Sequence, residues 1–226
     1  GLTAPGITVD PANGALSVDI TTGGTISTTG NGSAGIDAGA FDTSVFNLRV
    51  LGDGMSTAIS TQGDNANAIS LGDGTAGGST ATLGFQNTTL GTTGAGSDIL
   101  SGLGTNNLSF SLAFEGSTLT TTGTGSSVID LNFGSTSDAA LAFFDTGLQT
   151  SNANAHAINL MGGQGAVTNT ILLDSQVTTS GMGAQGVRLD IQDQSSTTVF
   201  IDNSTFATTG SSLFVQTESD TSTHNL

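Results

Sequence analysis

Few side chains in this sequence have a type and spacing that can do chemistry. Asp190 and Asp193 lie close to Arg188 along the chain. Two carboxylates beside a basic residue can act as acid and base in polysaccharide cleavage, or can bind calcium for that reaction. Asp190 and Asp193 are therefore the candidate catalytic pair. The sequence favours the simpler interpretation that both lie on a solvated outer face and in a turn, as most aspartates do.

The other candidate groups lack the partners that a site needs. Asp174 and Asp202 lie at nearly matching positions of adjacent repeats, where stacked carboxylates can trap a cation, but ordinary surface charge is favoured. The two LGDG segments, 51–54 and 71–74, are similar to calcium-binding glycine turns but lack the repeated G-G-x-G-x-D period that supplies the ligands. His156 has no nucleophile motif and no second histidine nearby, which favours a surface position. The sequence therefore predicts no catalytic, cofactor-binding or metal-binding site.

The composition excludes several classes of partner. The 226 residues include 2 Lys and Arg against 18 Asp and Glu, which gives a formal net charge of -16. These cations are too few to neutralise nucleic-acid phosphates, and an anionic membrane surface repels such a chain. The longest apolar run, Ala139–Phe144, is far shorter than the roughly 20 residues that span a bilayer, so we expect no membrane insertion of this segment. Because cysteine is absent, disulfides and thiolate chemistry are excluded as well.

The chain consists of repeats, and these repeats must position every one of the side chains above. Seven segments align, and the last four intervals between their first residues are each 29 residues. The first residue is always apolar, and a threonine follows two positions later. Because alternate side chains of a strand share a face, both residues should point inward. The segments begin at Ile26, Ile59, Leu90, Leu119, Leu148, Val177 and Phe206.

Two positions after the threonine, the repeat turns. Glycine fills this position in every segment but one, where asparagine stands, and these residue types tolerate positive φ, so we expect the positive-φ residue of the turn here. The column comprises Gly30, Gly63, Gly94, Gly123, Asn152, Gly181 and Gly210. The polar residues between the threonine and this position should face outward. They are Thr29, Gln62, Thr93, Thr122, Ser151, Ser180 and Thr209.

Two further strands complete each repeat. Apolar residues of the second strand should point inward, namely Ile36, Ile69, Leu100, Ile129, Ile158 and Val187. The polar residues next to them, expected outward, are Asp37, Ser70, Ser101, Asp130, Asn159 and Arg188. An inward column of the third strand comprises Phe85, Phe114, Phe143, Leu172 and Ile201. We expect its phenylalanines to stack in the core, because aromatic ladders suit a repeated axis.

Three short alternating strands per repeat predict an all-β fold, a single-stranded parallel β-helix (solenoid) of about seven coils of about 29 residues. The sequence itself does not show the handedness, and right-handed coiling is the expectation because crossover connections generally prefer it. A β-propeller is disfavoured because its blades need four antiparallel strands and about 40 residues. The predicted organisation is an N-terminal partial coil or cap (1–25), the β-helix repeats (26–216), and a polar tail or truncated next coil (217–226).

The repeat also carries a resemblance to a family. Ile59–Ile69 reads I-x-T-x-G-x-x-A-x-A-I, and Leu148–Ile158 follows this pattern with Leu and Asn at the first and fifth positions. Together with strands such as ATLGFQNTTL and TTVFIDNSTF, it resembles the passenger domains of bacterial autotransporters, over about residues 18–216. The resemblance implies export across the outer membrane and display at the cell surface as an adhesin. The translocating β-barrel of that family is not in this chain, nor is a recognised protease or lipase site.

The leading functional hypothesis is therefore a non-enzymatic, extracellular β-helix segment that acts as an adhesin or a stalk. Its expected partners are surface molecules of host or neighbouring cells, protein or glycan, and self-association through exposed strand edges is a further hypothesis. One alternative is a polysaccharide-cleaving β-helix that uses Asp190 and Asp193. The other is an ice-binding solenoid, which is disfavoured because one of the two outward hydroxyl columns is interrupted, as at Gly91 and Ala207.

Overall fold

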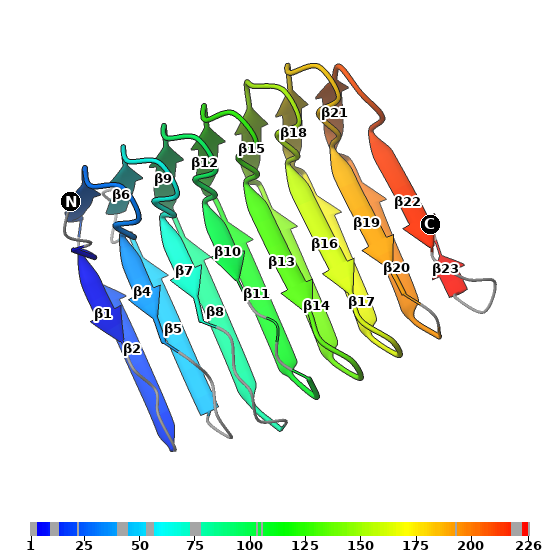
Figure 1. Ribbon diagram of the computed structural model, residues 1–226, viewed down its shortest axis with the longest axis horizontal. Helices are drawn as coiled ribbons and strands as arrows, with labels where there is room; N and C mark the ends of the chain where they lie inside the picture. The colour runs from blue at the N-terminus through cyan, green and yellow to red at the C-terminus, as the bar shows by residue number, and fades with distance from the viewer. Residues whose placement is uncertain are drawn as a thin grey trace.

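The computed structural model is an all-β parallel β-helix, as the repeats predict (Figure 1). It describes residues 4–9, 14–21, 23–39, 45–52, 57–72, 78–102, 104, 106–192, 194–217 and 223–225. Three parallel sheets, called A, B and C, run along the axis, and the chain visits them in that order in each coil. In Figure 1 the coils are stacked side by side from the N-terminal to the C-terminal end.

The bounds of the strands show the same three positions recurring in every coil. Sheet A comprises β1 (Ile7–Val9), β4 (Ile36–Ala38), β7 (Ile69–Leu71), β10 (Leu100–Gly102), β13 (Ile129–Phe133), β16 (Ile158–Gly162), β19 (Val187–Ile191) and β22 (Leu213–Thr217). Sheet B comprises β2 (Ala15–Thr21), β5 (Val45–Leu51), β8 (Thr80–Gln86), β11 (Ser109–Glu115), β14 (Asp138–Phe144), β17 (Val167–Leu173), β20 (Ser196–Asp202) and β23 (Thr223–Asn225). Sheet C comprises β3 (Thr25–Thr28), β6 (Thr57–Thr61), β9 (Thr88–Thr92), β12 (Thr118–Thr121), β15 (Gly147–Thr150), β18 (Gln176–Thr179) and β21 (Thr205–Thr208).

Residues at the same repeat position pair directly between neighbouring coils. In sheet C, Leu90 pairs with Leu119, which pairs with Leu148, and all three side chains are buried. Since parallel strands lie about 4.8 Å apart, each inward column forms a continuous ladder along the axis. The predicted inward column of sheet A is confirmed, because all its members from Ile36 to Val187 are fully buried.

The predicted phenylalanine stack is confirmed in sheet B. The ring centroids of Phe85 and Phe114 are 4.6 Å apart, and those of Phe114 and Phe143 are 5.8 Å apart. Val50 pairs with Phe85 at one end of the stack and Leu172 pairs with Phe143 at the other, and both are fully buried. Stacked rings contribute beyond the apolar area that they bury, so this column is a main part of the core.

The last member of the same column, Ile201, is not in the core. It is 41% exposed, so the expectation that it is buried was wrong, although its pairing with Leu172 keeps it at the inward position of the column. Among the described strands, β23 is the one that pairs with β20 on its far side, and it reaches only Ser196–Thr198. Among the described residues, Ile201 therefore has a paired residue on one side, Leu172, and the other side is left open.

The inward threonines at the ends of the sheet C strands have the structural role expected of them. Thr150 donates its hydroxyl to the carbonyl oxygen of Ala155 at 2.7 Å, and Thr28 donates to that of Ser33 at 2.6 Å. Thr61 makes the corresponding bond to the carbonyl of Ala66. The threonine hydroxyl therefore donates to a carbonyl oxygen of the turn that joins sheet C to sheet A, in place of a backbone N–H.

This role gives a paired prediction for two buried threonines. Replacing Thr150 with Val is expected to lower the free energy of unfolding by about 1–2 kcal/mol, because the buried carbonyl of Ala155 loses its donor. The control is Thr170, whose buried hydroxyl has no partner among the described residues and which pairs with Val199 in the next coil. Thr170→Val should be neutral or stabilising in urea unfolding. Equal losses in the two variants would contradict the assigned role.

The glycine column from Gly30 to Gly210 does not supply the positive-φ residue that the sequence predicts for the turn. Positive φ does not occur at this column but two positions later, at Gly32, Asn65, Gly96, Gly125, Asn154 and Gly183. A Cβ on Gly94 would lie 1.9 Å from the carbonyl oxygen of Gly63, and one on Gly123 would lie 1.8 Å from that of Gly94. The column is therefore rich in glycine because successive backbones approach each other closely there. Asn152, its one other residue, donates from Nδ2 to the carbonyl of Thr122.

Candidate functional site

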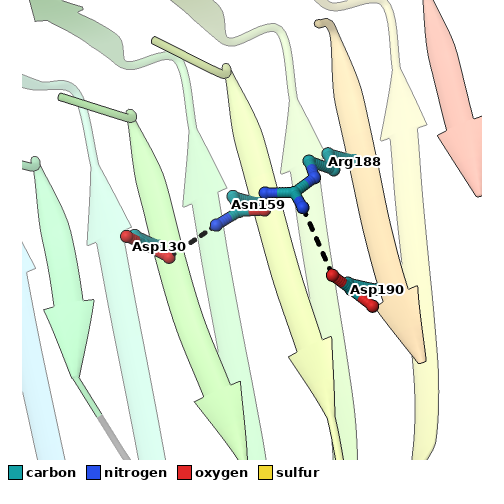
Figure 2. A network of polar contacts seen from close by, with 4 residues as sticks. All are labelled: Asp130, Asn159, Arg188 and Asp190. Atoms are coloured by element: carbon teal, nitrogen blue, oxygen red, sulfur yellow. Dashed lines mark hydrogen bonds and ion pairs between the residues drawn. The ribbon is translucent and has the colours of Figure 1, made fainter. Parts of the chain in front are cut away.

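A line of polar side chains crosses the outer face of sheet A (Figure 2). Asp130 on β13, Asn159 on β16 and Arg188 on β19 occupy the same position of three successive coils. Asn159 Nδ2 donates to Asp130 Oδ1 at 2.8 Å, and Arg188 Nη2 pairs with Asp190 Oδ2 at 3.2 Å. We call these four residues the sheet A polar network. It brings two carboxylates, an amide and a guanidinium onto one face of three neighbouring strands.

The centre of this network is less accessible than its outward position suggests. Asn159 was expected on an exposed face, but it is 6% exposed, since Asp130 and Arg188 flank it in the same column. Its Oδ1 atom has no hydrogen-bond partner among the described residues. The network is therefore a partly buried polar structure and not a freely solvated row of side chains.

Asp98 lies in the turn before β10 and is the most perturbed acid of the described residues. Its side chain is 6% exposed, and its Oδ1 accepts a 2.6 Å hydrogen bond from the backbone N–H of Ser127 in the next coil. Burial, and then the negative charge of Asp130, raise the pKa of Asp98 to about 7. Burial also raises the pKa of Asp130, although Asn159 and Arg188 act in the opposite direction. Asp98 is therefore partly protonated near neutral pH.

His156 lies in the same turn column as Asp98, two coils further on. Its Nδ1 accepts a 3.1 Å hydrogen bond from the backbone N–H of Gln185, so the proton of the neutral ring resides on Nε2. Burial and the positive charge of Arg188 lower the pKa of His156. A neutral imidazole with one nitrogen already engaged in the turn has a structural role in linking two coils.

The predicted catalytic pair is described only in part. Asp190 forms the ion pair with Arg188, and the two side chains are 27% and 30% exposed. Asp190 also lines a hollow of about 200 Å³ together with Asn132, Met161 and Gln192. Asp193 lies outside the described residues. Asp190 thus has a basic partner and an adjacent hollow, and its pairing with Asp193 stays a prediction.

The remaining candidates are not brought together as a site. Asp174 is a positive-φ turn residue whose carboxylate accepts a hydrogen bond from Asn203, while Asp202 lies one position earlier in its own coil. The aspartates of both LGDG segments lie outside the described residues. Among the residues that are described, no three His, Asp or Glu side chains cluster in a way that could hold a metal ion. Asp174 therefore contributes to a turn and not to a pair of stacked carboxylates.

The ion pair of the polar network gives a prediction for NMR titration. Replacing Arg188 with Met is expected to raise the pKa of Asp130 and of His156, because the guanidinium lowers both values. The stability loss should stay below about 1 kcal/mol, because the pair is partly exposed to solvent. Arg49→Met on sheet B is the matched control and should leave both pKa values unchanged. An unchanged pKa of His156 in Arg188→Met would show that the charge does not act on the imidazole.

The outer face of sheet C presents the column that was predicted to face outward. All its members, from Thr29 through Thr93 and Thr122 to Thr209, are exposed. The neighbouring outward column is interrupted by Gly91 and Ala207, and Ser60 in this column donates to Ser27 at 3.3 Å. The face is therefore polar and rich in hydroxyls, without the two unbroken threonine columns that an ice-binding surface needs.

Sequence reasoning missed Asp98 although a signal for it is present. Asn67, Asp98, Ser127, His156 and Gln185 occupy one repeat position, two residues before the inward apolar residue of sheet A. Three of its members, Asn67, Asp98 and His156, accept a hydrogen bond from the backbone N–H of the next coil, as Asn67 does from Asp98 at 2.9 Å. A polar residue in every one of these copies was the signal for such a ladder.

Comparison with known proteins adds no family to this picture. Neither a family model, nor a curated protein, nor a solved structure matches the chain. The described part of the chain contains no helix that is long and apolar enough to cross a membrane. The fold and its side chains are therefore the basis for assigning a function.

Proposed function

We propose that this chain is a non-enzymatic β-helix segment of a secreted or cell-surface, autotransporter-like protein, and that it acts outside the cell as an adhesin or a stalk. The observation that best supports this proposal is the continuous register between coils, which extends through sheets A, B and C. In a solenoid each coil contacts only its neighbours, so continuous pairing makes a stiff, extended body. Such a body can hold another domain away from the surface or offer its own sides to a partner.

The surface chemistry suits this role. The net charge of -16 keeps an extended body hydrated and disfavours contact with other acidic surfaces. The outer face of sheet C offers many hydroxyl and amide groups, which form numerous weak polar contacts. The expected partners are proteins or glycans on the surfaces of host or neighbouring cells.

An adhesion assay tests this proposal. Beads coated with the purified chain should bind to cultured epithelial cells, to immobilised matrix proteins or glycans, or to each other, and uncoated beads should not. Binding to any of these surfaces supports an adhesin. The absence of binding to all of them would leave the stalk as the function, and a catalytic turnover of glycans would overturn both.

A second candidate function is cleavage of a polysaccharide by Asp190 and Asp193. The observation in its favour is that Asp190 lines the hollow on sheet A beside the Arg188 guanidinium. A catalytic role predicts release of reducing ends from a glycan panel, and loss of this release in Asp190→Ala. A chain that releases no reducing ends has no such activity.

A further inference from the structure

The outer face of sheet B contains a hollow that none of the functions above uses. Its volume is about 220 Å³, and it extends over four neighbouring strands, β5, β8, β11 and β14. Gly84 and Ala113 form its floor, since they are the small residues at the position that Arg49 occupies in β5. The hollow therefore exists because two successive coils carry almost no side chain at one outward position.

The walls of the hollow combine apolar and polar groups. Phe144 is 37% exposed and lines one end of the hollow; its strand is the third from that of Arg49, so the two backbones are roughly 14 Å apart along the axis. Between them lie Gln86 and Glu115, and Gln86 Nε2 donates to Glu115 Oε2 at 3.2 Å. Among the described residues, Arg49 forms no ion pair. An aromatic ring and three planar polar groups thus surround one shallow, apolar floor.

We propose that this hollow binds one sugar unit of a neutral glycan. A pyranose ring has an apolar face that packs on an aromatic ring, and hydroxyl groups around its edge that both donate and accept hydrogen bonds. Arg49 only donates, the Glu115 carboxylate only accepts, and Gln86 does both, so hydroxyl groups satisfy all three. The volume is below the range of about 300–1,000 Å³ typical of larger ligands and suits a single ring of a longer chain.

The charges of the walls favour a neutral ligand over charged ones. An acidic sugar would be repelled by the carboxylate of Glu115 and by the overall charge of -16. A basic peptide side chain would be repelled by the guanidinium of Arg49. The inference rests on the adhesin form of the proposed function and specifies its ligand class.

NMR titration of the whole ¹⁵N-labelled chain tests this inference. The probes are mannotriose, cellotriose and galactotriose, with trigalacturonate and the peptide Ala-Phe-Ala as the competing ligand classes. At least one neutral trisaccharide should shift the amide signals of Gly84, Ala113 and Glu115. Phe144→Ala should weaken its binding about tenfold, because the exposed ring contributes a main apolar contact. Phe200→Ala removes an equally large ring from the same face, outside the hollow, and should change the affinity less than twofold.

A second variant fills the hollow. Gly84→Leu should abolish the shifts while the protein stays folded, since a Cβ at Gly84 meets no atom within 4 Å. The inference fails if no neutral trisaccharide shifts these signals, if only trigalacturonate or the peptide does, or if Gly84→Leu binds as well as the parent. If Gly84→Leu does not fold, the comparison of the trisaccharide affinities of Phe144→Ala and Phe200→Ala tests the inference instead.

The adhesion assay separates this inference from the proposed function. If beads coated with Gly84→Leu adhere as well as beads coated with the parent chain, the adhesin function stands and the sugar site is ruled out as its basis. If a trisaccharide binds in the hollow but the coated beads adhere to nothing, the sugar site stands and the adhesin function is ruled out.

Discussion

Replacing Asp98 with Asn is expected to stabilise the protein above pH 7 and to change its stability little at pH 4. The pKa of Asp98 is about 7 in the folded protein against an ordinary value of 3.8, so the folded state holds this proton more tightly than the unfolded state. The stability due to the protonated carboxyl is complete below about pH 3.8 and is lost as the pH rises to about 7. The loss is on the order of 4 kcal/mol, and Asn does not incur it.

Asn should fit at position 98 because the fold already has one in the same column. Asn67 Oδ1 accepts from the backbone N–H of Asp98 in the way that Asp98 Oδ1 accepts from that of Ser127. The measurement is the free energy of urea unfolding at pH 4, 6 and 8. Asp138→Asn, at an exposed position of β14, is the matched control and should change it by about 0.5 kcal/mol or less. Parallel pH curves for Asp98→Asn and the parent chain would exclude a buried, proton-binding Asp98.

Replacing Gly94 with Ala is expected to be among the most destabilising single changes in the chain. Its Cβ would lie 1.9 Å from the carbonyl oxygen of Gly63, and that atom belongs to the backbone and cannot rotate away. Ala also lacks the amide with which Asn152 bonds to the backbone at the same repeat position. We expect a loss of about 3 kcal/mol or more, because two coils must move apart to admit the methyl group.

Gly147→Ala is the control for this experiment. Gly147 begins β15 in sheet C, and a Cβ there meets no atom within 4 Å, so the change should be neutral or slightly stabilising. The midpoints of urea unfolding should therefore separate the two variants clearly. Similar midpoints would mean that the coils can separate at Gly94 without cost.

The fold was predictable because a parallel β-helix converts repeat position directly into spatial position. Once the spacing of 29 residues placed Leu90, Leu119 and Leu148 in line, their pairing and burial followed. The stack of Phe85 and Phe114 followed for the same reason. The pattern of one repeat was thus enough to define the register of its neighbours.

The site was less predictable because burial in turns depends on how the backbone folds over itself. Asp98 belongs to a polar column in the turn before sheet A, where its charge alone would favour an exposed position, yet the turn covers its carboxyl. The two glycine-rich columns of the same turn look alike in composition, although Gly94 is required for a close approach and Gly96 for positive φ. The exposure of Ile201 was not predictable either, since it depends on how far the next coil extends and not on the sequence of its own repeat.

The continuous register between coils has a consequence for how the chain folds. Partners in the ladders lie about one repeat apart in sequence, as in the hydrogen bond from Thr88 to Ser117, 29 residues away. The loop that must close for each new coil therefore has the same entropy cost however long the chain becomes. Each coil can pair on the edge left by the one before it, so folding can proceed by addition of one coil at a time. A chain with this topology can fold progressively as it emerges from a ribosome or a narrow pore.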